Sequence, residues 1–257
     1  LFLDGYNECP ESLQLNLTRS IRAFSLRYGA SIVICTQQDI SRCDLLEAHT
    51  VFVHRPSDEL KASLAKVSKP DPTGNLHSLL QVTTSGLEAS LAGQVGTTLS
   101  AGSSRFGLFD SYARIKLGIA ASEGIRLLTS IAEKLVLETC FSLSVREFDR
   151  LCDGANLVHL DGPQLIRSKL LHVRGDRVSF VHELFFAAFS AEAVIRSANG
   201  NAQKIIAALD SPRFFSAKVF ILGAVENNKV LQEVLSNLND QDLLSACFQG
   251  ECAEHVN

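Results

Sequence analysis

The sequence has no Met, no Trp and few runs of charged residues. Such absences limit the classes of protein to which the chain can belong. No apolar run approaches the ~20 residues that a membrane-spanning helix requires, which excludes an integral membrane protein. The first apolar stretch is interrupted by Asp4 and Glu8, which excludes a signal peptide. We therefore expect a cytoplasmic protein with no membrane partner. Because the chain begins at Leu1 and contains no Met, we also expect it to be part of a longer protein.

Basic patches and paired cysteines are also missing. The net charge is −4 and no run of Lys or Arg occurs, whereas nucleic-acid binding depends on contacts between basic side chains and phosphates. We therefore expect no nucleic-acid partner. The 7 cysteines are odd in number, scattered and without a C-x-x-C pair. Zinc sites and disulfide scaffolds need closer pairing, so the sequence predicts free thiols that serve as small apolar residues.

The N-terminal part alternates strands and a helix. The apolar runs 1–4, 31–36 and 51–54 predict three buried strands, and the spacing of apolar residues over 11–28 predicts a helix that ends at Gly29. Strand, helix and strand in this order are typical of a parallel α/β sheet. Three strands are too few for a complete domain of that class. The sequence therefore predicts, over residues 1–56, the C-terminal part of an α/β domain.

The rest of the chain is predicted to be helical apart from one hairpin. A helical domain is expected over 57–106, and a second unit over 107–196 with helices at 109–118, 125–140, 142–152 and 163–171. The third of these begins with a capping box, Ser144 and Glu147. Strands around an Arg-Gly-Asp turn predict a β-hairpin within 169–182, and helices followed by such a hairpin indicate a winged helix. Short helices over 197–257 predict the start of HEAT-like repeats. The expected fold class is mostly α, with a partial α/β sheet at the N-terminus.

The first strand ends in a motif that carries chemistry. In L-F-L-D-G-Y-N-E, Asp4 follows a buried strand and Glu8 follows four residues later. This is the Walker B pattern of P-loop ATPases, in which the first acid holds Mg²⁺ and the second polarises the attacking water. The alternative is an ordinary strand followed by a Gly-containing turn. The neighbouring strand ends at polar Thr36, which is where ATPases place a residue that senses the γ-phosphate.

His182 lies between the hairpin and an aromatic, Ala-rich helix. The segment 180–195 reads FVHELFFAAFSAEAVI, so aromatic residues follow His182 at three, four and seven positions. On its residues alone, His182 is either a functional histidine or a satisfied histidine of the core.

The order of these segments resembles the NACHT family of STAND signal-transduction ATPases. LFLDGYNE, IVICTQQ, SSRFGLFDSYARIKLG and SFVHELFFAAFSAEAVI match that family's order of Walker B strand, sensor strand, helical domain and winged helix. The resemblance covers about 1–196, and 197–257 would be its helical-repeat sequel. The resemblance implies that Asp4 binds the metal and that Glu8 activates the attacking water. It also implies that Thr36 senses the γ-phosphate and that His182 contacts the β-phosphate of ADP. The implied cofactors are ATP, ADP and Mg²⁺.

The sequence also departs from the family. Asn7 replaces the commoner Asp, Gln37 and Gln38 stand where a sensor Arg often follows, and no proline near 80–86 matches the helical-domain proline. No G-x-x-x-x-G-K-[ST] occurs in the sequence, so the phosphate-binding loop is absent from it.

The resemblance implies an oligomerising switch controlled by ADP and ATP, in signalling, defence or innate immunity. It would respond to an unidentified ligand on its C-terminal repeats, self-associate on activation, and hydrolyse ATP slowly as a complete protein. Two alternatives remain. One is a winged-helix DNA-binding regulator, although residues 144–156 carry more acidic than basic side chains. The other is a helical scaffold without nucleotide chemistry.

Overall fold

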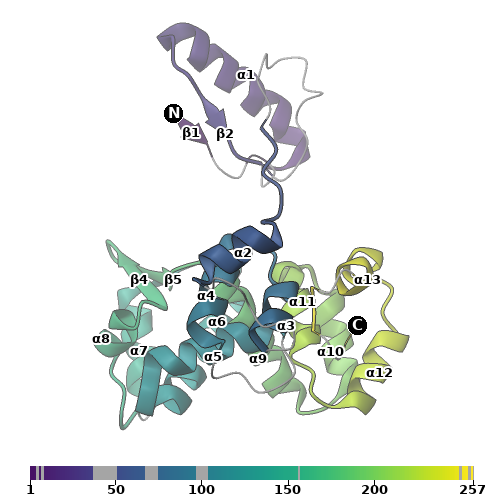
Figure 1. The fold of residues 1–257 in the computed structure, drawn as a ribbon. Coiled ribbons are helices and arrows are strands. Elements are labelled where there is room, and N and C mark those ends of the chain that lie inside the picture. Colours follow the sequence, from purple (N-terminus) through teal and green to yellow (C-terminus); the bar gives the residue numbers. More distant parts are fainter. Residues whose placement is uncertain are drawn as a thin grey trace. The chain divides into compact units, whose positions relative to one another are not determined.

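The chain divides into two units, Leu1–His54 and Arg55–Asn257, which are described separately here as unit 1 and unit 2 (Figure 1). The structure is a computed structural model. It describes residues 1–3, 6, 9–36, 51–66, 75–96, 104–155, 157–248, 251–253 and 256.

Unit 1 contains a β-α-β element. Strands β1 (Phe2–Leu3) and β2 (Val33–Ile34) pair in parallel, and α1 (Glu11–Tyr28) connects them. Gly29 ends α1 in the left-handed conformation, with φ of 59°, where a residue without Cβ meets no steric penalty. The parallel pairing of the first two strands and the span of the helix confirm the sequence prediction.

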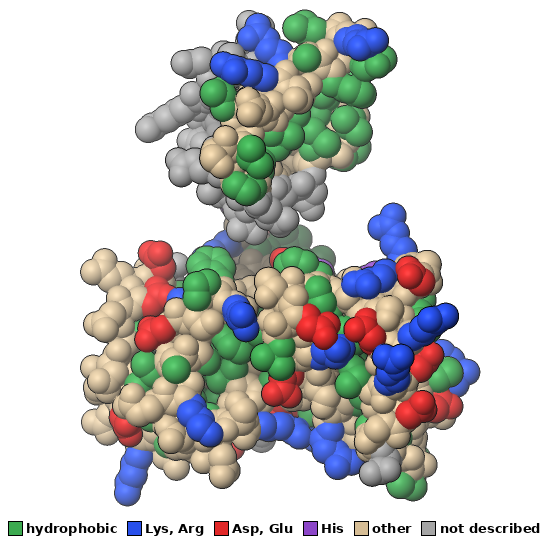
Figure 2. All heavy atoms as spheres, turned by 180° about the vertical axis from the view of Figure 1, so that it is seen from behind, with side chains coloured by type: hydrophobic (Ala, Val, Ile, Leu, Met, Phe, Trp, Pro, Cys, Tyr) green, Lys and Arg blue, Asp and Glu red, His purple; other side chains and the backbone are tan. Residues whose placement is uncertain are grey.

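The prediction that the strands of unit 1 are buried is wrong within the described residues. Phe2 of β1 is 79% exposed and Val33 of β2 is 47% exposed, so neither strand is enclosed. The third strand, predicted at 51–54, does not form: residues 51–57 have no regular structure, and Val53 is 95% exposed. An apolar run becomes a strand only where a neighbour takes its backbone hydrogen bonds, and no such pairing is found for the described residues of this run. Figure 2 shows hydrophobic side chains gathered on the visible face of unit 1.

Unit 2 is mainly helical. Its described helices, in chain order, are α2 (Asp58–Leu64), α3 (Asn75–Val82), α4 (Gly86–Val95), α5 (Arg105–Leu117), the 3-10 helix η2 (Gly118–Ala120), α6 (Ala121–Glu138), α7 (Val145–Gly154), α8 (Gly162–Arg167), α9 (Glu183–Ala198), α10 (Ala202–Asp210), the 3-10 helix η3 (Pro212–Ala217), α11 (Lys218–Gly223), α12 (Asn228–Ser236) and α13 (Gln241–Phe248). Many begin where a short polar side chain accepts a hydrogen bond from the first turn, as Ser57, Ser85, Ser104, Ser144, Asp161, Asn201 and Asn227 do. The capping box of Ser144 and Glu147 is confirmed.

One small antiparallel sheet interrupts these helices. Its strand order is β3 (Leu143–Ser144), β5 (Arg177–Phe180), β4 (Leu171–Arg174). β4 and β5 form the predicted hairpin, and Gly175 in its turn has a φ of +63°. The helix expected at 163–171 ends earlier, at Arg167, because Lys169 adopts a left-handed φ of 62° and Leu171 joins β4.

A single hydrophobic core runs through unit 2. At its centre, the ring of Phe109 in α5 meets Phe185 of α9 edge to face, with 4.9 Å between centroids, and Phe220 of α11 at 5.5 Å. In Figure 1, α5, α6 and α9 lie in the middle of the unit, with α7, α8 and the hairpin on one side and α10 to α13 on the other. Long helices that cross the middle therefore join the hairpin to the C-terminal helices.

The described part of the chain is mostly helical with two small sheets, as the sequence predicts. The expected boundaries at 106 and 196 fall inside α5 and α9. The division of unit 2 into helical, winged-helix and repeat domains stays a prediction.

Two further findings concern the cysteines and the length and polarity of the helices. The prediction of free thiols is wrong for Cys247 and Cys252, which form a disulfide, while Cys9, Cys35, Cys140 and Cys152 are free. The spacing of that pair did not suggest a bond because a helix end, rather than a sequence motif, brings the two residues together. In the described ranges, every helix is too short or too polar to span a bilayer.

Candidate functional site

The first part of the candidate site is the edge of the unit 1 sheet where both strands end. Leu3 pairs with Ile34, and the amide of Cys35 donates to the Leu3 carbonyl at 2.8 Å, so the ladder continues to the carboxyl ends of both strands. Asp4 is the next residue along the chain after β1, and half-buried Thr36 follows β2. The carboxyl ends of parallel strands are where α/β proteins bind their ligands. Asp4 and Glu8 themselves lie outside the described residues.

A tyrosine inside the Walker B-like motif anchors this segment to α1. The side chain of Tyr6 is buried, and its hydroxyl shares a hydrogen bond of 2.7 Å with the hydroxyl of Thr18. Gln14 donates to the Cys9 carbonyl at 3.0 Å, which fixes the chain on the far side of Glu8. Sequence reasoning gave Tyr6 no role, although an aromatic residue between two acids was a visible signal.

His182 is exposed, so the interpretation of this residue as core packing is wrong. It is the N-cap of α9: its backbone is extended, and its Nδ1 accepts a hydrogen bond from the amide of Leu184 at 3.2 Å. The aromatic residues that follow take the core positions instead, and Phe185 and Phe189 are buried. The core thus holds the helix in place, and the helix start presents the imidazole to solvent.

The cap defines the hydrogen-bonding state of the imidazole. Because Nδ1 accepts the Leu184 amide, it carries no proton, and the proton of the neutral ring lies on Nε2. The exposed end of His182 is therefore a hydrogen-bond donor at the positive end of a 16-residue helix. The carboxylate of Glu183, in the first turn, opposes anion binding there. The arrangement leaves Nε2 as an outward-facing hydrogen-bond donor.

Of the predicted site residues, the structure describes Thr36 and His182. Thr36 follows β2, which pairs with β1, so the two strands are neighbours as expected. His182 belongs to unit 2, and the two acids are outside the described residues. The predicted meeting of Asp4, Glu8 and His182 on one nucleotide stays a prediction.

Sequence reasoning missed a buried charge network in unit 2. Arg105 Nε lies 2.5 Å from Glu88 Oε1, and the side chains are 9% and 0% exposed. The other oxygen of Glu88 accepts bonds from the amides and hydroxyls of Thr84 and Ser85 at 2.9 to 3.0 Å. The S-x-x-E signature at 85–88 could have indicated the cap. Nothing in the sequence pairs it with Arg105, since the fold brings them together.

No metal-binding cluster of three or more His, Cys, Asp or Glu side chains occurs among the residues that the structure describes, a set that excludes Asp4 and Glu8. A scan against models of known protein families finds no match to this chain, and a search of curated proteins finds none either.

Proposed function

We propose that this chain is the C-terminal part of a NACHT-type STAND ATPase, a switch that ADP holds closed and ATP opens. The observation that carries the proposal is His182, an exposed imidazole fixed by its own helix cap so that Nε2 donates outward. An exposed imidazole with an outward-facing donor can contact a phosphate oxygen, whereas a histidine buried in the core cannot.

The order of elements also supports the proposal. Strand β3 lies between α6 and α7 and pairs with β5, so a strand from the helical segment joins the hairpin in one antiparallel sheet, as expected for a winged helix. The helix pairs α10 to α13 follow directly, as helical repeats would. In unit 1, exposed apolar side chains on β1 and α1 are consistent with a larger sheet that buries them.

Each expected cofactor has candidate ligands. Asp4 would hold Mg²⁺, Glu8 would polarise the attacking water, and Thr36 would contact the γ-phosphate. His182 would donate to the β-phosphate of ADP. When bound, Mg²⁺ would supply charge neutralisation for phosphoryl transfer. The phosphate-binding loop has no counterpart in the sequence and must come from elsewhere in the protein.

The partners follow from the same proposal. The C-terminal helices α10 to α13 would bind the activating ligand, and the ATP form would self-associate. A ligand shifts such an equilibrium only by its difference in affinity for the two forms.

The first test is to read the encoded sequence before Leu1. The proposal requires a G-x-x-x-x-G-K-[ST] there, within about a hundred residues, the span of one helix and two strands with their connections. When the longer protein that contains this loop is purified and denatured, the nucleotide that it releases is expected to be ADP. The absence of such a loop would support the scaffold alternative, which the single core of unit 2 also fits.

The second test separates the two roles of His182 in that longer protein. His182→Asn keeps a good N-cap but removes the outward imidazole donor, whereas His182→Ala removes both. Both variants are expected to weaken ADP binding about tenfold or more, the value of one hydrogen bond to a charged group, as measured by titration with a fluorescent ADP analogue. Only His182→Ala should also lower stability, by about 1 kcal/mol. Wild-type ADP affinity in both variants would remove His182 from the nucleotide site.

A further inference from the structure

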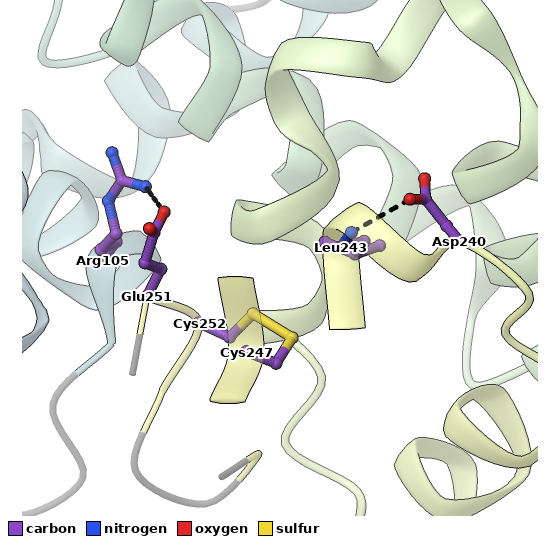
Figure 3. The surroundings of a disulfide bond; sticks show 6 residues. All are labelled: Arg105, Asp240, Leu243, Cys247, Glu251 and Cys252. Carbon is purple, nitrogen blue, oxygen red and sulfur yellow. Dashed lines mark hydrogen bonds and ion pairs between the residues drawn. A yellow bond between two sulfur atoms is a disulfide. The ribbon is translucent and has the colours of Figure 1, made fainter. Parts of the chain in front are cut away.

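The segment Glu251–Ala253 folds back onto the start of α5, and a disulfide holds it (Figure 3). Cys247, in the last turn of α13, is bonded to Cys252. Both cysteines are buried, and Cys252 and Ala253 are fully so. We call residues 251–253 the C-terminal strap.

The strap supplies a hydrogen bond that α5 cannot make internally. Ser104 and Ala253 form an antiparallel bridge, and the amide of Arg105 donates to the Cys252 carbonyl at 3.4 Å. Arg105 is the first residue of α5, so its amide has no acceptor inside the helix. Gly223, the last residue of α11, leaves room for the same carbonyl, because a Cβ there would lie 2.9 Å from it.

The strap also inserts a carboxylate between two guanidinium groups. Glu251 lies 2.5 Å from Arg55 and 3.7 Å from Arg105, and its side chain is only 13% exposed. Arg105 continues the network to Glu88 and lies over the ring of Phe220, 5.0 Å from its centroid. The strap therefore joins α13 to the first residue of unit 2 and to the caps of α4 and α5.

A disulfide that closes so short a ring acts locally. The two cysteines are 5 residues apart, so the bond removes little entropy from the unfolded chain. Its effect is to keep Cys252, and with it Glu251, on the surface formed by α5 and α11. Without the bond, the strap must order its own backbone and desolvate Glu251, and both steps cost free energy.

We propose that Cys247 and Cys252 form a redox-sensitive clip that controls the seating of the C-terminal strap on Arg105 and Arg55. Two thiols react with one low-molecular-weight disulfide by thiol–disulfide exchange. The two cysteines lose two electrons and two protons and form the intrachain bond, while the small disulfide is reduced to two thiols. Disulfides in reducing compartments are mostly transient or redox-sensing, which fits the cytoplasmic location expected from the sequence. The inference goes beyond the proposed function and requires no nucleotide.

The test uses the full chain, equilibrated with reduced and oxidised glutathione at several ratios. Differential alkylation and mass spectrometry report the state of Cys247 and Cys252, and amide hydrogen exchange reports the strap. In the oxidised chain both cysteines should resist alkylation, and the Arg105 amide should exchange at least tenfold more slowly than in the reduced chain.

Three variants locate the effect. Cys247→Ser should exchange at Arg105 like the reduced wild type at every ratio, because the clip cannot close. Cys152→Ser, a substitution of a half-buried free cysteine in α7, should keep the full redox response. Glu251→Gln should still form the disulfide but exchange faster at Arg105, since its ion pairs are lost.

Three results would overturn the clip. They are equal Arg105 exchange in oxidised and reduced wild type, a stable mixed disulfide with glutathione in place of the intrachain bond, and a redox response that persists in Cys247→Ser. Should that variant fail to fold, the exchange difference within wild type decides alone. ADP binding has no part in these measurements, so failure of the clip and failure of the nucleotide proposal are distinguishable.

Discussion

The free cysteines of this chain occupy different environments, and Cys152 is the most perturbed of those that the structure describes. It is half-buried in α7, and burial raises the pKa of its thiol from 9.0 to about 11. The carboxylates of Asp149, Asp153 and Asp161 add to the shift, because a thiolate near them would be repelled. The thiol form of Cys152 is therefore favoured at neutral pH.

Cys152 should react slowly with iodoacetamide in the native chain. At pH 8 its thiolate fraction is about a hundredfold lower than that of an ordinary cysteine, and the greater nucleophilicity of a high-pKa thiolate recovers about tenfold. A net rate about tenfold below that of the denatured chain is expected, and it should keep rising between pH 9 and pH 10.5. Mass spectrometry of the peptide that contains Cys152, sampled over time, gives the rate. A rate that levels off near pH 9 would contradict the raised pKa.

At the scale of elements, α2 and α4 pack closely through one glycine. A Cβ on Gly93 of α4 would lie 2.2 Å from the backbone oxygen of Ala65, at the end of α2. Backbone atoms cannot turn away as a side chain can, so the two helices would have to separate.

Gly93→Ala is therefore expected to destabilise unit 2. Overpacking costs about 1–3 kcal/mol. A Cβ only 2.2 Å from a backbone atom places Gly93→Ala at the upper end of that range, which exceeds the roughly 1 kcal/mol by which Ala favours a helix over Gly. Gly154, at the end of α7, is a matched control, because a Cβ there would meet nothing within 4 Å. Gly154→Ala should be neutral or stabilising by up to about 1 kcal/mol. Urea unfolding followed by circular dichroism measures both, and similar effects of the two substitutions would argue against the close packing.

The helices were predictable because their signals are local. The span 11–28, the capping box at Ser144 and the hairpin all depend on residues within one or two turns of each other, and the structure has them. The predictions of a strand at 51–54 and of free thiols at Cys247 and Cys252 were wrong because strand pairing and disulfide formation depend on contacts that the fold makes. For the same reason, the exposure of His182 could be found only once the helix and its core face were placed.

At the scale of the whole molecule, the boundary between the units falls in a segment without helix or strand. Residues 51–57 have no regular structure, and Val51 and Val53 are 84% and 95% exposed. Unit 2 has a core of its own, which includes the fully buried Phe109. In unit 1, by contrast, Phe2 and Leu26 are 79% and 76% exposed.

These features predict that residues 51–257, which contain all of unit 2, fold without residues 1–50. Thermolysin cleaves before apolar residues, so a brief digestion of the full chain should cut first at 51–53 and leave a resistant fragment that extends through unit 2. The same fragment, expressed alone, should unfold cooperatively. Its Tm should lie within about 4 °C of the main transition of the full chain, which corresponds to about 1 kcal/mol for a domain of this size. Rapid degradation of the fragment, or a broad transition without a native baseline, would mean that unit 2 depends on unit 1 for its fold.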